Sequence, residues 1–399
     1  MASHPLSKRV LYLSESQTIG MAKKSRELAA QGVDVINLSL GEPDFVTPKH
    51  IREAAKKAID DGFTFYTPIA GFPELRKAIS AKFKRENNLE YAPDQIVVST
   101  GAKQSIANVV LSLVDPGDEV IIPMPFWVSY IEIVKLAEGK VVTVSTDIAH
   151  DFKMTAAQLE SAITPKTKLI IFSSPCNPTG SVYSREELAG FVQVLERHPH
   201  VFVMSDEIYE HINFVGSHTS IAEFPSVRDR VIIVNGVSKG YAMTGWRIGY
   251  IGAPKWIADA CDKIQGQFTS GASSIAQKAA EAALNGDMRP TQEMMEAFRH
   301  RRDLVLRLMK DIPGIKLNMP EGAFYVFADI SSFLGKSDGN TPVRTAEDLC
   351  MYLLNTAHVS LVTGEAFGDP NCFRMSYATS EDKLTEAVRR IREALSRLR

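Results

Sequence analysis

The chain has 399 residues, of which 45% are hydrophobic and 23% are charged, and its 45 basic and 47 acidic side chains leave a formal net charge of −2. This balance excludes a global attraction to nucleic acid or to an anionic membrane, and no apolar stretch approaches the length of a membrane-spanning helix. We therefore expect a soluble cytoplasmic protein of two or three domains with no nucleic-acid or membrane partner.

The first ninety residues predict helices and loops more than a sheet. A capped helix is expected over 16–32, followed by a short strand over 33–38 and the loop LGEPDF. Two more helices are expected after Pro48 and near Pro73, where proline suits a first helical turn. We assign residues 1–47 to an N-terminal arm and a segment of a small domain.

Short apolar runs then alternate with helical periods, which is typical of a mainly parallel sheet covered by helices on both faces. The seven runs are 96–99, 119–123, 140–144, 168–174, 201–206, 231–235 and 249–253. We predict an α/β fold in which residues 48–290 form a large domain around a seven-stranded sheet.

The remainder predicts a second, smaller α/β domain over residues 291–399. Helical patterns dominate 257–311. They include a long, highly charged helix that is expected to link the two domains. Short strands, a helix near Ala346 and a closing helix over 380–398 follow, with 335–342 expected as a surface loop. The four cysteines, Cys176, Cys261, Cys350 and Cys372, are scattered without metal-ligand spacing, so we predict reduced thiols and no metal site.

Chemically suggestive loops follow four of the predicted strands. They are TGAK (100–103), SSPCNPTG (173–180), DEIY (206–209) and SKGYAMTGWR (238–247). Because ligands of such sheets bind at the carboxyl ends of the strands, we expect these loops to converge at one edge.

Lys239 and Arg247 form the first candidate pair. A reactive amine beside a guanidinium anion site suits Schiff-base chemistry on a phosphorylated carbonyl cofactor, and pyridoxal phosphate is the obvious candidate. Taken alone, the pair favours solvated surface residues, because most lysines and arginines are exposed, and the chemical interpretation depends on the residues around it.

A pyridoxal phosphate site also needs a carboxylate for the ring nitrogen and donors for the phosphate. Asp206 is placed for the first role, although a helix cap or turn is an equal alternative. Gly101 and Ala102 open a helix after Thr100, and with the Ser238 hydroxyl they suit the phosphate.

The phenolic oxygen of the cofactor ring accepts hydrogen bonds and is stabilised by nearby donors. Asn177 and Tyr209 are the candidates. Asn177 lies in CNPTG, where an Asn-Pro turn is the alternative reading.

These motifs, together with LSLGEPDF, FYTPIAGFPELR and FRMSYATS, resemble the class I/II aminotransferases of pyridoxal phosphate fold type I, with the best match in the bacterial aspartate aminotransferase subgroup. The resemblance runs from about Ser7 to the C-terminus. It implies pyridoxal 5′-phosphate as cofactor, and ping-pong transfer of an amino group between L-aspartate and 2-oxoglutarate.

The resemblance also implies roles for the residues around the cofactor. Lys239 bonds covalently to it, Asp206 pairs with its ring nitrogen, and Tyr209 and Asn177 bond its phenolic oxygen. Trp127, in PFWVSY, stacks on the ring face, although a tryptophan on its own is more often a core residue.

Other positions correspond to substrate and subunit contacts in that family. Arg374 matches the arginine that binds the α-carboxylate of the amino acid or 2-oxoacid substrate, and Gly41 lies in a loop lining the same pocket. Tyr66 matches a tyrosine that reaches the phosphate of the neighbouring subunit, which implies a homodimer with shared active sites.

Lys103, Ser16 and Thr18 match the residues that meet the side-chain carboxylate of a dicarboxylic substrate, and Lys103 also belongs to the cofactor turn, with a lysine on the helix surface as the alternative for Lys103. Relatives that accept prephenate carry a Lys-Pro pair where this chain has Ser14-Glu15, so we do not expect prephenate activity. An aromatic or alanine aminotransferase and a C–S lyase of the same fold stay open as alternatives. A regulator is disfavoured because no basic N-terminal DNA-binding module is present.

Overall fold

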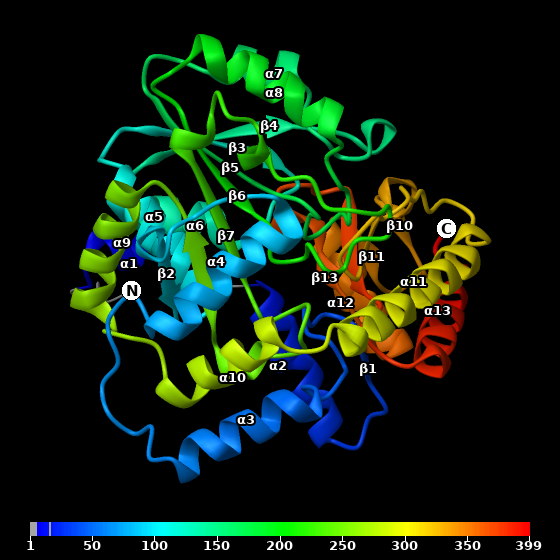
Figure 1. Cartoon of the computed structure of the whole chain (residues 1–399). Coiled ribbons are helices and arrows are strands. Elements are labelled where there is room, and N and C mark those ends of the chain that lie inside the picture. The colour runs from blue at the N-terminus through cyan, green and yellow to red at the C-terminus, as the bar shows by residue number, and fades with distance from the viewer. Residues whose placement is uncertain (1–5, 16) are drawn as a thin grey trace.

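The computed structural model describes residues 6–15 and 17–399, and its elements form two α/β parts (Figure 1). The larger part contains a seven-stranded sheet. Its strands are β2 (Ile96–Ser99), β3 (Glu119–Met124), β4 (Lys140–Ser145), β5 (Thr167–Ser173), β6 (Phe202–Asp206), β7 (Val231–Gly236) and β8 (Gly249–Gly252). All seven lie where the apolar runs predicted them.

The strand order is β2-β8-β7-β6-β5-β3-β4; β8 pairs antiparallel with β2 and with β7, and the other neighbouring pairs are parallel. The prediction of a mainly parallel seven-stranded sheet is confirmed. Because side chains alternate along a strand, Val97 packs into the apolar cluster on one face and Val98 into the cluster on the other. Burial of both faces explains why the strands read as continuous apolar runs.

Helices cover both faces of this sheet. The cluster containing Val97 includes residues of α5 (Ala102–Leu113), α6 (Ser129–Leu136) and α9 (Lys255–Phe268). The cluster containing Val98 includes residues of α3 (Lys49–Asp60), α4 (Pro73–Asn87), α7 (Ala156–Ala162), α8 (Arg185–Arg197) and α10 (Ser274–Asn285). Helix α6 begins three residues after Phe126, near which it was expected.

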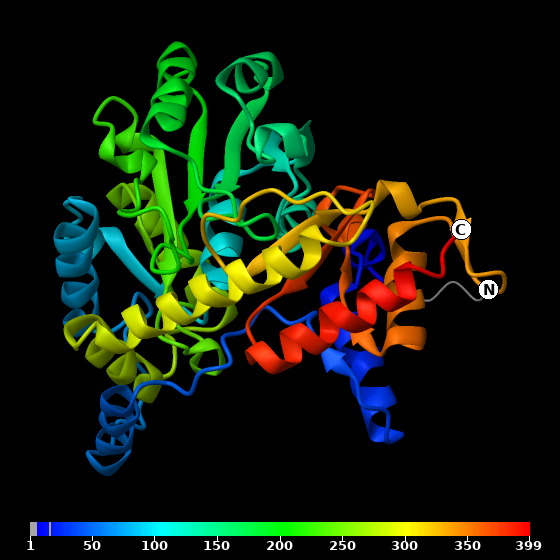
Figure 2. The ribbon, with the colours of Figure 1, turned by 90° about the vertical axis from the view of Figure 1, so that its right-hand side faces the viewer.

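The smaller part has its own core. An antiparallel sheet in the order β13-β14-β9 packs with α12 (Ala346–Ala357) and α13 (Glu381–Leu395). Its strands are β13 (Val362–Thr363), β14 (Cys372–Ser376) and β9 (Tyr325–Asp329). The long α11 (Arg289–Lys310) runs from the larger part to the smaller one (Figure 2).

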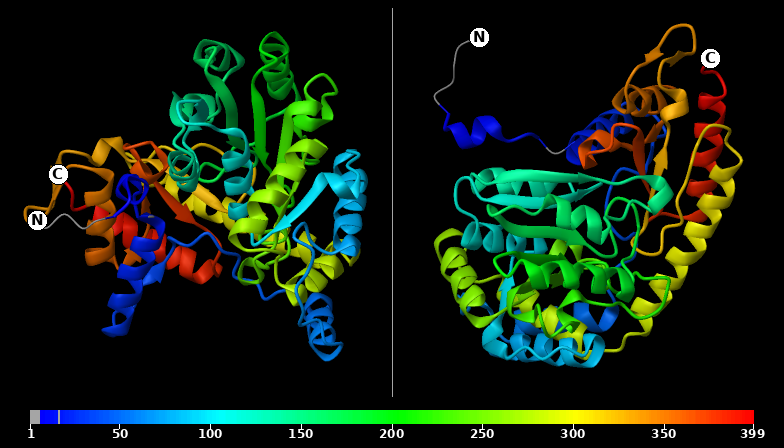
Figure 3. Two further views of the ribbon diagram at one scale, coloured as in Figure 1. Left: turned by 90° about the vertical axis from the view of Figure 1, so that its left-hand side faces the viewer. Right: turned by 90° about the horizontal axis from the view of Figure 1, so that it is seen from above.

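The N-terminal segment joins the smaller part, since β1 (Ile36–Asn37) pairs in parallel with β12 (Val359–Ser360). Helix α2 (Gln17–Ala30) precedes this strand, and the exposed α1 (Lys8–Tyr12) lies on the outside of the molecule (Figure 3). The domain boundaries at residues 47 and 290 stay predictions.

Two smaller sequence expectations have clear outcomes. The expected loop over 335–342 is wrong in part, because β10 (Lys336–Ser337) and β11 (Pro342–Val343) pair there as a short antiparallel hairpin. All four cysteines are free thiols, as expected. No helix in the described part of the chain combines the length and apolarity needed to cross a membrane.

Candidate active site

A cavity of about 350 Å³ lies where the four predicted loops meet, against the N-terminal segment and β14. Its walls include Gly41, Ala102, Lys103, Trp127, Asn177, Asp206, Tyr209, Ser238, Lys239, Arg247 and Arg374. The sheet brings these residues together because β5, β6 and β7 run parallel and end at the same edge. Gly101 lies just behind this wall, Ser16 lies outside the described residues, and the side chain of Thr18 is likewise not described.

Lys239 lies three residues after the end of β7 and lines the cavity. Its Nζ donates a hydrogen bond to the carbonyl oxygen of Gly41 at 2.5 Å. Burial lowers the pKa of Lys239 to about 8; Glu42 opposes this shift and Arg247 adds to it. A larger share of the amine is therefore neutral near pH 7 than for an exposed lysine, and the neutral amine is the nucleophile.

The turn that carries Lys239 is held in place by Thr47 of the N-terminal segment. Thr47 donates its hydroxyl hydrogen to the carbonyl oxygen of Ala242 at 2.6 Å and accepts one from the indole of Trp246 at 3.0 Å. Ala242 and Arg247 both have positive φ, at 50° and 57°, where side chains other than glycine are rare. These contacts fix a backbone shape that directs both Lys239 and Arg247 into one cavity.

Asp206 ends β6 and is 5% exposed. One carboxylate oxygen accepts a hydrogen bond from the hydroxyl of Tyr130 at 2.7 Å, and the other accepts one from the backbone N–H of Ile208 at 3.3 Å. Burial raises the pKa of Asp206 to about 6, although the Tyr130 hydrogen bond acts against the shift. A carboxyl group in this environment is stabilised by a nearby cation.

The start of α5 and Arg247 together offer hydrogen-bond donors that suit an anion. Gly101 precedes the helix with φ 83°, and a Cβ atom there would collide with the guanidinium of Arg247. The first N–H groups of a helix have no partner within it, and here Ala102 and Lys103 supply them at the cavity wall. Within the described residues, Arg247 pairs with no carboxylate and donates to the carbonyl oxygen of Thr244 at 2.8 Å.

Arg374, on β14, is 2% exposed. Its Nη1 and Nη2 atoms donate to Asn177 Oδ1 at 2.9 Å and to the carbonyl oxygen of Ser39 at 2.7 Å. Its Nε atom has no partner, and no carboxylate pairs with the guanidinium in the described part of the chain. A buried, uncompensated guanidinium is costly, so this one is suited to a carboxylate ligand that accepts bidentate hydrogen bonds.

Lys103 lies at the cavity mouth with its Nζ 5.0 Å from the centre of the Trp127 ring. Desolvation lowers the pKa of Lys103, and the positive charge of Arg247 adds to the shift. The Trp127 ring in turn meets Tyr130 edge to face, with centroids 5.4 Å apart. Tyr66 is fully exposed and does not line the cavity of its own chain.

Sequence reasoning missed two tyrosines. Tyr130 bonds Asp206, and Tyr325 lies with its hydroxyl 2.8 Å from that of Tyr209. The first had a signal, since it lies three residues after Trp127 in the same motif. The second had none, because its approach to Tyr209 depends on how the smaller part packs against the larger.

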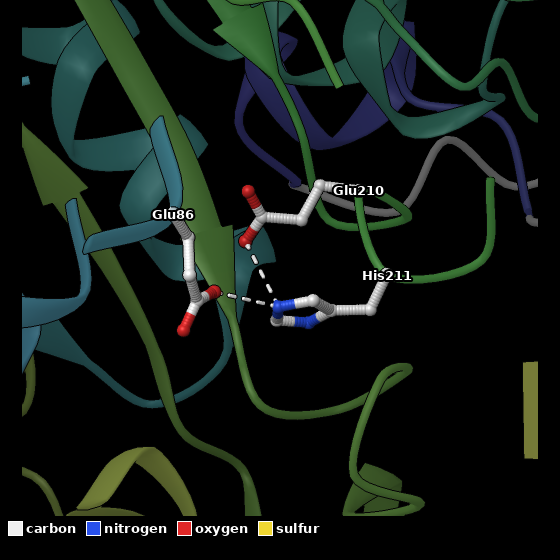
Figure 4. Close-up of side chains that lie close together, drawn as sticks. All are labelled: Glu86, Glu210 and His211. Carbon is white, nitrogen blue, oxygen red and sulfur yellow. Dashed lines mark hydrogen bonds and ion pairs between the residues drawn. The ribbon is translucent and has the colours of Figure 1, made fainter. Parts of the chain in front are cut away.

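A second polar cluster lies outside the cavity. His211 lies between Glu86 and Glu210, with its Nε2 atom 2.8 Å from Glu86 Oε2 and 3.8 Å from Glu210 Oε1 (Figure 4). This donor set resembles that of a metal site. Lys82 is fully buried there, forms an ion pair with Glu210 and lies 3.6 Å from Glu86, so an ammonium group already supplies the cation.

Comparison with known proteins identifies the family. Residues 33–391 match the family described as aminotransferase class I and II. The chain belongs to this family. It is 51% identical over 397 residues to a protein of Petunia hybrida named bifunctional aspartate aminotransferase and glutamate/aspartate-prephenate aminotransferase, covering 98% of this chain and 82% of that protein.

Solved structures of aminotransferases have the same fold. The aspartate aminotransferase of Rhizobium meliloti superposes with a TM-score of 0.96 at 45% identity, covering all of both chains. The Thermus thermophilus aspartate aminotransferase with maleate has a TM-score of 0.92 at 40% identity, covering 98% of this chain and 100% of that one. The predicted family and fold of this aminotransferase are thus confirmed.

Proposed function

We propose that this aminotransferase uses pyridoxal 5′-phosphate to move an amino group between L-aspartate and 2-oxoglutarate, producing oxaloacetate and L-glutamate. One observation carries the proposal. The buried Arg374 has no carboxylate partner in the described chain and lines the same cavity as the reactive Lys239. An amino acid held by Arg374 through its α-carboxylate would present its amino group to that cavity.

The cavity residues fit the cofactor. Asp206, with its pKa raised by burial, suits a pyridinium nitrogen, and the amine of Lys239 suits the aldehyde. Arg247, the Ser238 hydroxyl and the N–H groups at the start of α5 suit the phosphate. Asn177 and Tyr209 would hold the phenolic oxygen, and the Trp127 ring would cover one face.

The bound cofactor supplies the carbonyl that stores the amino group and withdraws electrons from the substrate α-carbon. Lys239 would then be the base: its neutral Nζ would take the proton from the α-carbon and return it to the former carbonyl carbon of the cofactor. Asp206, ionised beside a cation, would keep a proton on the ring nitrogen. A single cavity serves the amino donor and then the oxoacid, which gives ping-pong kinetics.

Two cationic side chains support a dicarboxylic substrate. Arg374 would bind the α-carboxylate and Lys103, at the mouth, the side-chain carboxylate. Relatives are named for aspartate and for prephenate, and we propose aspartate without prephenate because Ser14-Glu15 replaces the Lys-Pro pair. Aromatic or alanine transamination and C–S lyase activity are the alternatives that the experiment must separate.

A half-reaction tests this proposal. Purified protein with bound cofactor is titrated with L-aspartate in the absence of an oxoacid, and we expect the visible cofactor band to disappear as oxaloacetate is released. A band that responds to alanine or phenylalanine but not to aspartate would overturn the substrate assignment. Release of pyruvate and ammonia from cysteine conjugates would reveal a lyase, and no cofactor band at all would refute the whole proposal.

We further propose that the enzyme is a cytoplasmic homodimer, a location that the four free thiols suit. Tyr66 is 100% exposed and Phe65 is 84% exposed, and Leu11 and Tyr12 of α1 add further exposed apolar surface. Sharing of sites is testable by mixing Tyr66→Ala and Lys239→Ala proteins, both of low activity, under conditions of subunit exchange. Recovery of activity supports shared sites, and no recovery contradicts them.

A further inference from the structure

Tyr325 is a buried cavity residue at the meeting point of three parts of the chain. It lies on β9 of the smaller part, is 0% exposed and lines the cavity. Its hydroxyl lies 2.8 Å from the hydroxyl of Tyr209 in the larger part. A Cβ atom at Gly41 would collide with the same hydroxyl, so the N-terminal segment closes on it as well.

The ring and the hydroxyl of Tyr325 contact different groups. The guanidinium carbon of Arg374 lies 4.5 Å from the centre of the Tyr325 ring, within the range of cation–π attraction. The hydroxyl instead faces Tyr209, which would bond the phenolic oxygen of the cofactor. A Tyr→Phe change removes the second contact and keeps the first.

The direction of the hydrogen bond between the two phenols decides what Tyr209 can do. Each hydroxyl has one hydrogen, so only one of the pair donates to the other. Burial raises the pKa of both Tyr209 and Tyr325, and both therefore keep their hydrogens at neutral pH. If Tyr325 donates, the hydrogen of Tyr209 is available to a ligand in the cavity, and the chain of two bonds makes Tyr209 a stronger donor.

We propose, on the basis of the proposed function, that Tyr325 is a positioning residue that donates to Tyr209 and so directs the Tyr209 hydroxyl at the phenolic oxygen of the cofactor. A donor at that oxygen competes with the proton on the neighbouring Lys239 nitrogen for the oxygen lone pairs. The relay consequently favours the deprotonated nitrogen. Tyr325 thereby sets the pH range in which the resting enzyme can accept a protonated amino acid.

The test is a pH titration of the visible cofactor band in wild-type enzyme and in Tyr325→Phe. We expect the midpoint of the variant to rise by about one pH unit. A single neutral hydrogen bond that stabilises only the form with the deprotonated nitrogen has a free energy of that size. The KM for the amino acid should change little, because the ring under Arg374 remains. An unchanged midpoint would overturn the inference, whereas a wild-type enzyme without any visible band would refute the proposed function instead.

Two further variants separate a relay from a general structural effect. Tyr352→Phe removes another buried hydroxyl, which donates to the carbonyl oxygen of Ala394 at 3.1 Å and does not line the cavity, and it should leave the midpoint unchanged. In a Tyr209→Phe background, Tyr325→Phe should produce no further shift, because the relay is already broken. Equal shifts in the single variant and in this background contradict the relay.

A fluorotyrosine at position 325 covers the case in which Tyr325→Phe fails to fold. It keeps the hydroxyl in place and makes it a more acidic, stronger donor. The midpoint should then move downward, opposite to the phenylalanine variant. An upward or absent shift with fluorotyrosine would also overturn the proposal.

Discussion

The Nζ atom of Lys239 donates a hydrogen bond to the carbonyl oxygen of Gly41 at 2.5 Å, across 198 residues of sequence. Lys239 follows a strand of the large sheet, whereas Gly41 belongs to the N-terminal segment that is tied to α11 by the Asp44–Arg301 ion pair at 2.6 Å. The amine that would bind the cofactor therefore also holds the N-terminal segment over the cavity. Covalent attachment of the cofactor would replace this contact.

The protonation of Lys239 gives the first prediction. In cofactor-free protein we expect its reaction with an amine-acylating reagent to rise with pH around a midpoint of about 8, because burial disfavours the charged amine. Lys255 is the internal control, since its hydrogen bond with Asp259 raises its pKa above the ordinary 10.5. Mass spectrometry of the labelled peptides measures both. A Lys239 midpoint equal to that of Lys255 would contradict the prediction.

Asp206→Asn tests the buried carboxyl in cofactor-free protein. The folded-state pKa of about 6 lies above the unfolded value of 3.8, so the stability linked to the bound proton is present below 3.8 and is lost as pH rises through about 6. The Asn variant avoids this loss and still accepts the Tyr130 hydrogen bond. We expect it to be more stable than wild type near neutral pH, on the order of 2–3 kcal/mol, and similar to wild type near pH 4.

Urea unfolding of both proteins at the two pH values measures this difference. Asp287→Asn is the control, because backbone and side-chain hydrogen bonds from Arg289 lower the pKa of that exposed carboxylate. It should show no gain in stability at neutral pH. A constant difference between Asp206→Asn and wild type at both pH values would show that the carboxyl does not titrate in this window.

The sheet and the convergence of its loops could be predicted from sequence because both depend on local patterns. A buried parallel strand reads as an apolar run, and residues at or shortly after its end lie at the carboxyl edge, which is how Asp206 and Lys239 were found. Helix starts at Pro48 and Pro73 followed from the fixed φ of proline.

Contacts between residues far apart in the sequence could not be predicted in this way. Tyr209 and Tyr325 are 116 residues apart, and Tyr130 and Asp206 are 76 apart, so each pair forms only through tertiary packing. The hairpin within 335–342 was missed because two-residue strands give no periodic signal. The role of Tyr66 needs a second chain and stays a prediction.

Lys103→Ala tests substrate choice. We expect the KM for aspartate to rise about tenfold, because aspartate loses one charge-assisted hydrogen bond at a partly solvated site. The KM for alanine should stay unchanged, because alanine has no side-chain carboxylate. Steady-state kinetics with both donors measures the difference. Lys263→Ala removes an exposed lysine that does not line the cavity and should affect neither donor. Equal effects of Lys103→Ala on both donors would remove the argument for a dicarboxylic substrate.

Arg374→Lys tests the α-carboxylate site. A lysine keeps the charge but loses the planar fork, so it cannot bond Asn177, Ser39 and a carboxylate together. We expect kcat/KM to fall roughly 100-fold for every amino acid, chiefly through KM. Arg390→Lys, at an ion pair with Asp34 in the same part of the molecule, should retain wild-type kinetics. A wild-type KM in Arg374→Lys would assign carboxylate binding elsewhere.

The buried ion pair between Lys82 and Glu210 gives a prediction about stability. Burial alone would raise the pKa of Glu210, and the Lys82 ammonium instead holds it well below its usual range. Lys82→Met removes the largest favourable charge from the buried Glu210 carboxylate and leaves it only the amides of Asn87 and Asn235 and the more distant imidazoles, so we expect the free energy of unfolding at neutral pH to fall by about 3–5 kcal/mol. In Lys82→Met we expect the folded-state pKa of Glu210 to be raised. The loss of unfolding free energy relative to wild type should therefore grow as pH rises above about 4.5.

The double variant Lys82→Met/Glu210→Gln removes the buried charge and should recover part of this loss. An equal loss in the single and the double variant would show that packing around Lys82, and not charge, is responsible.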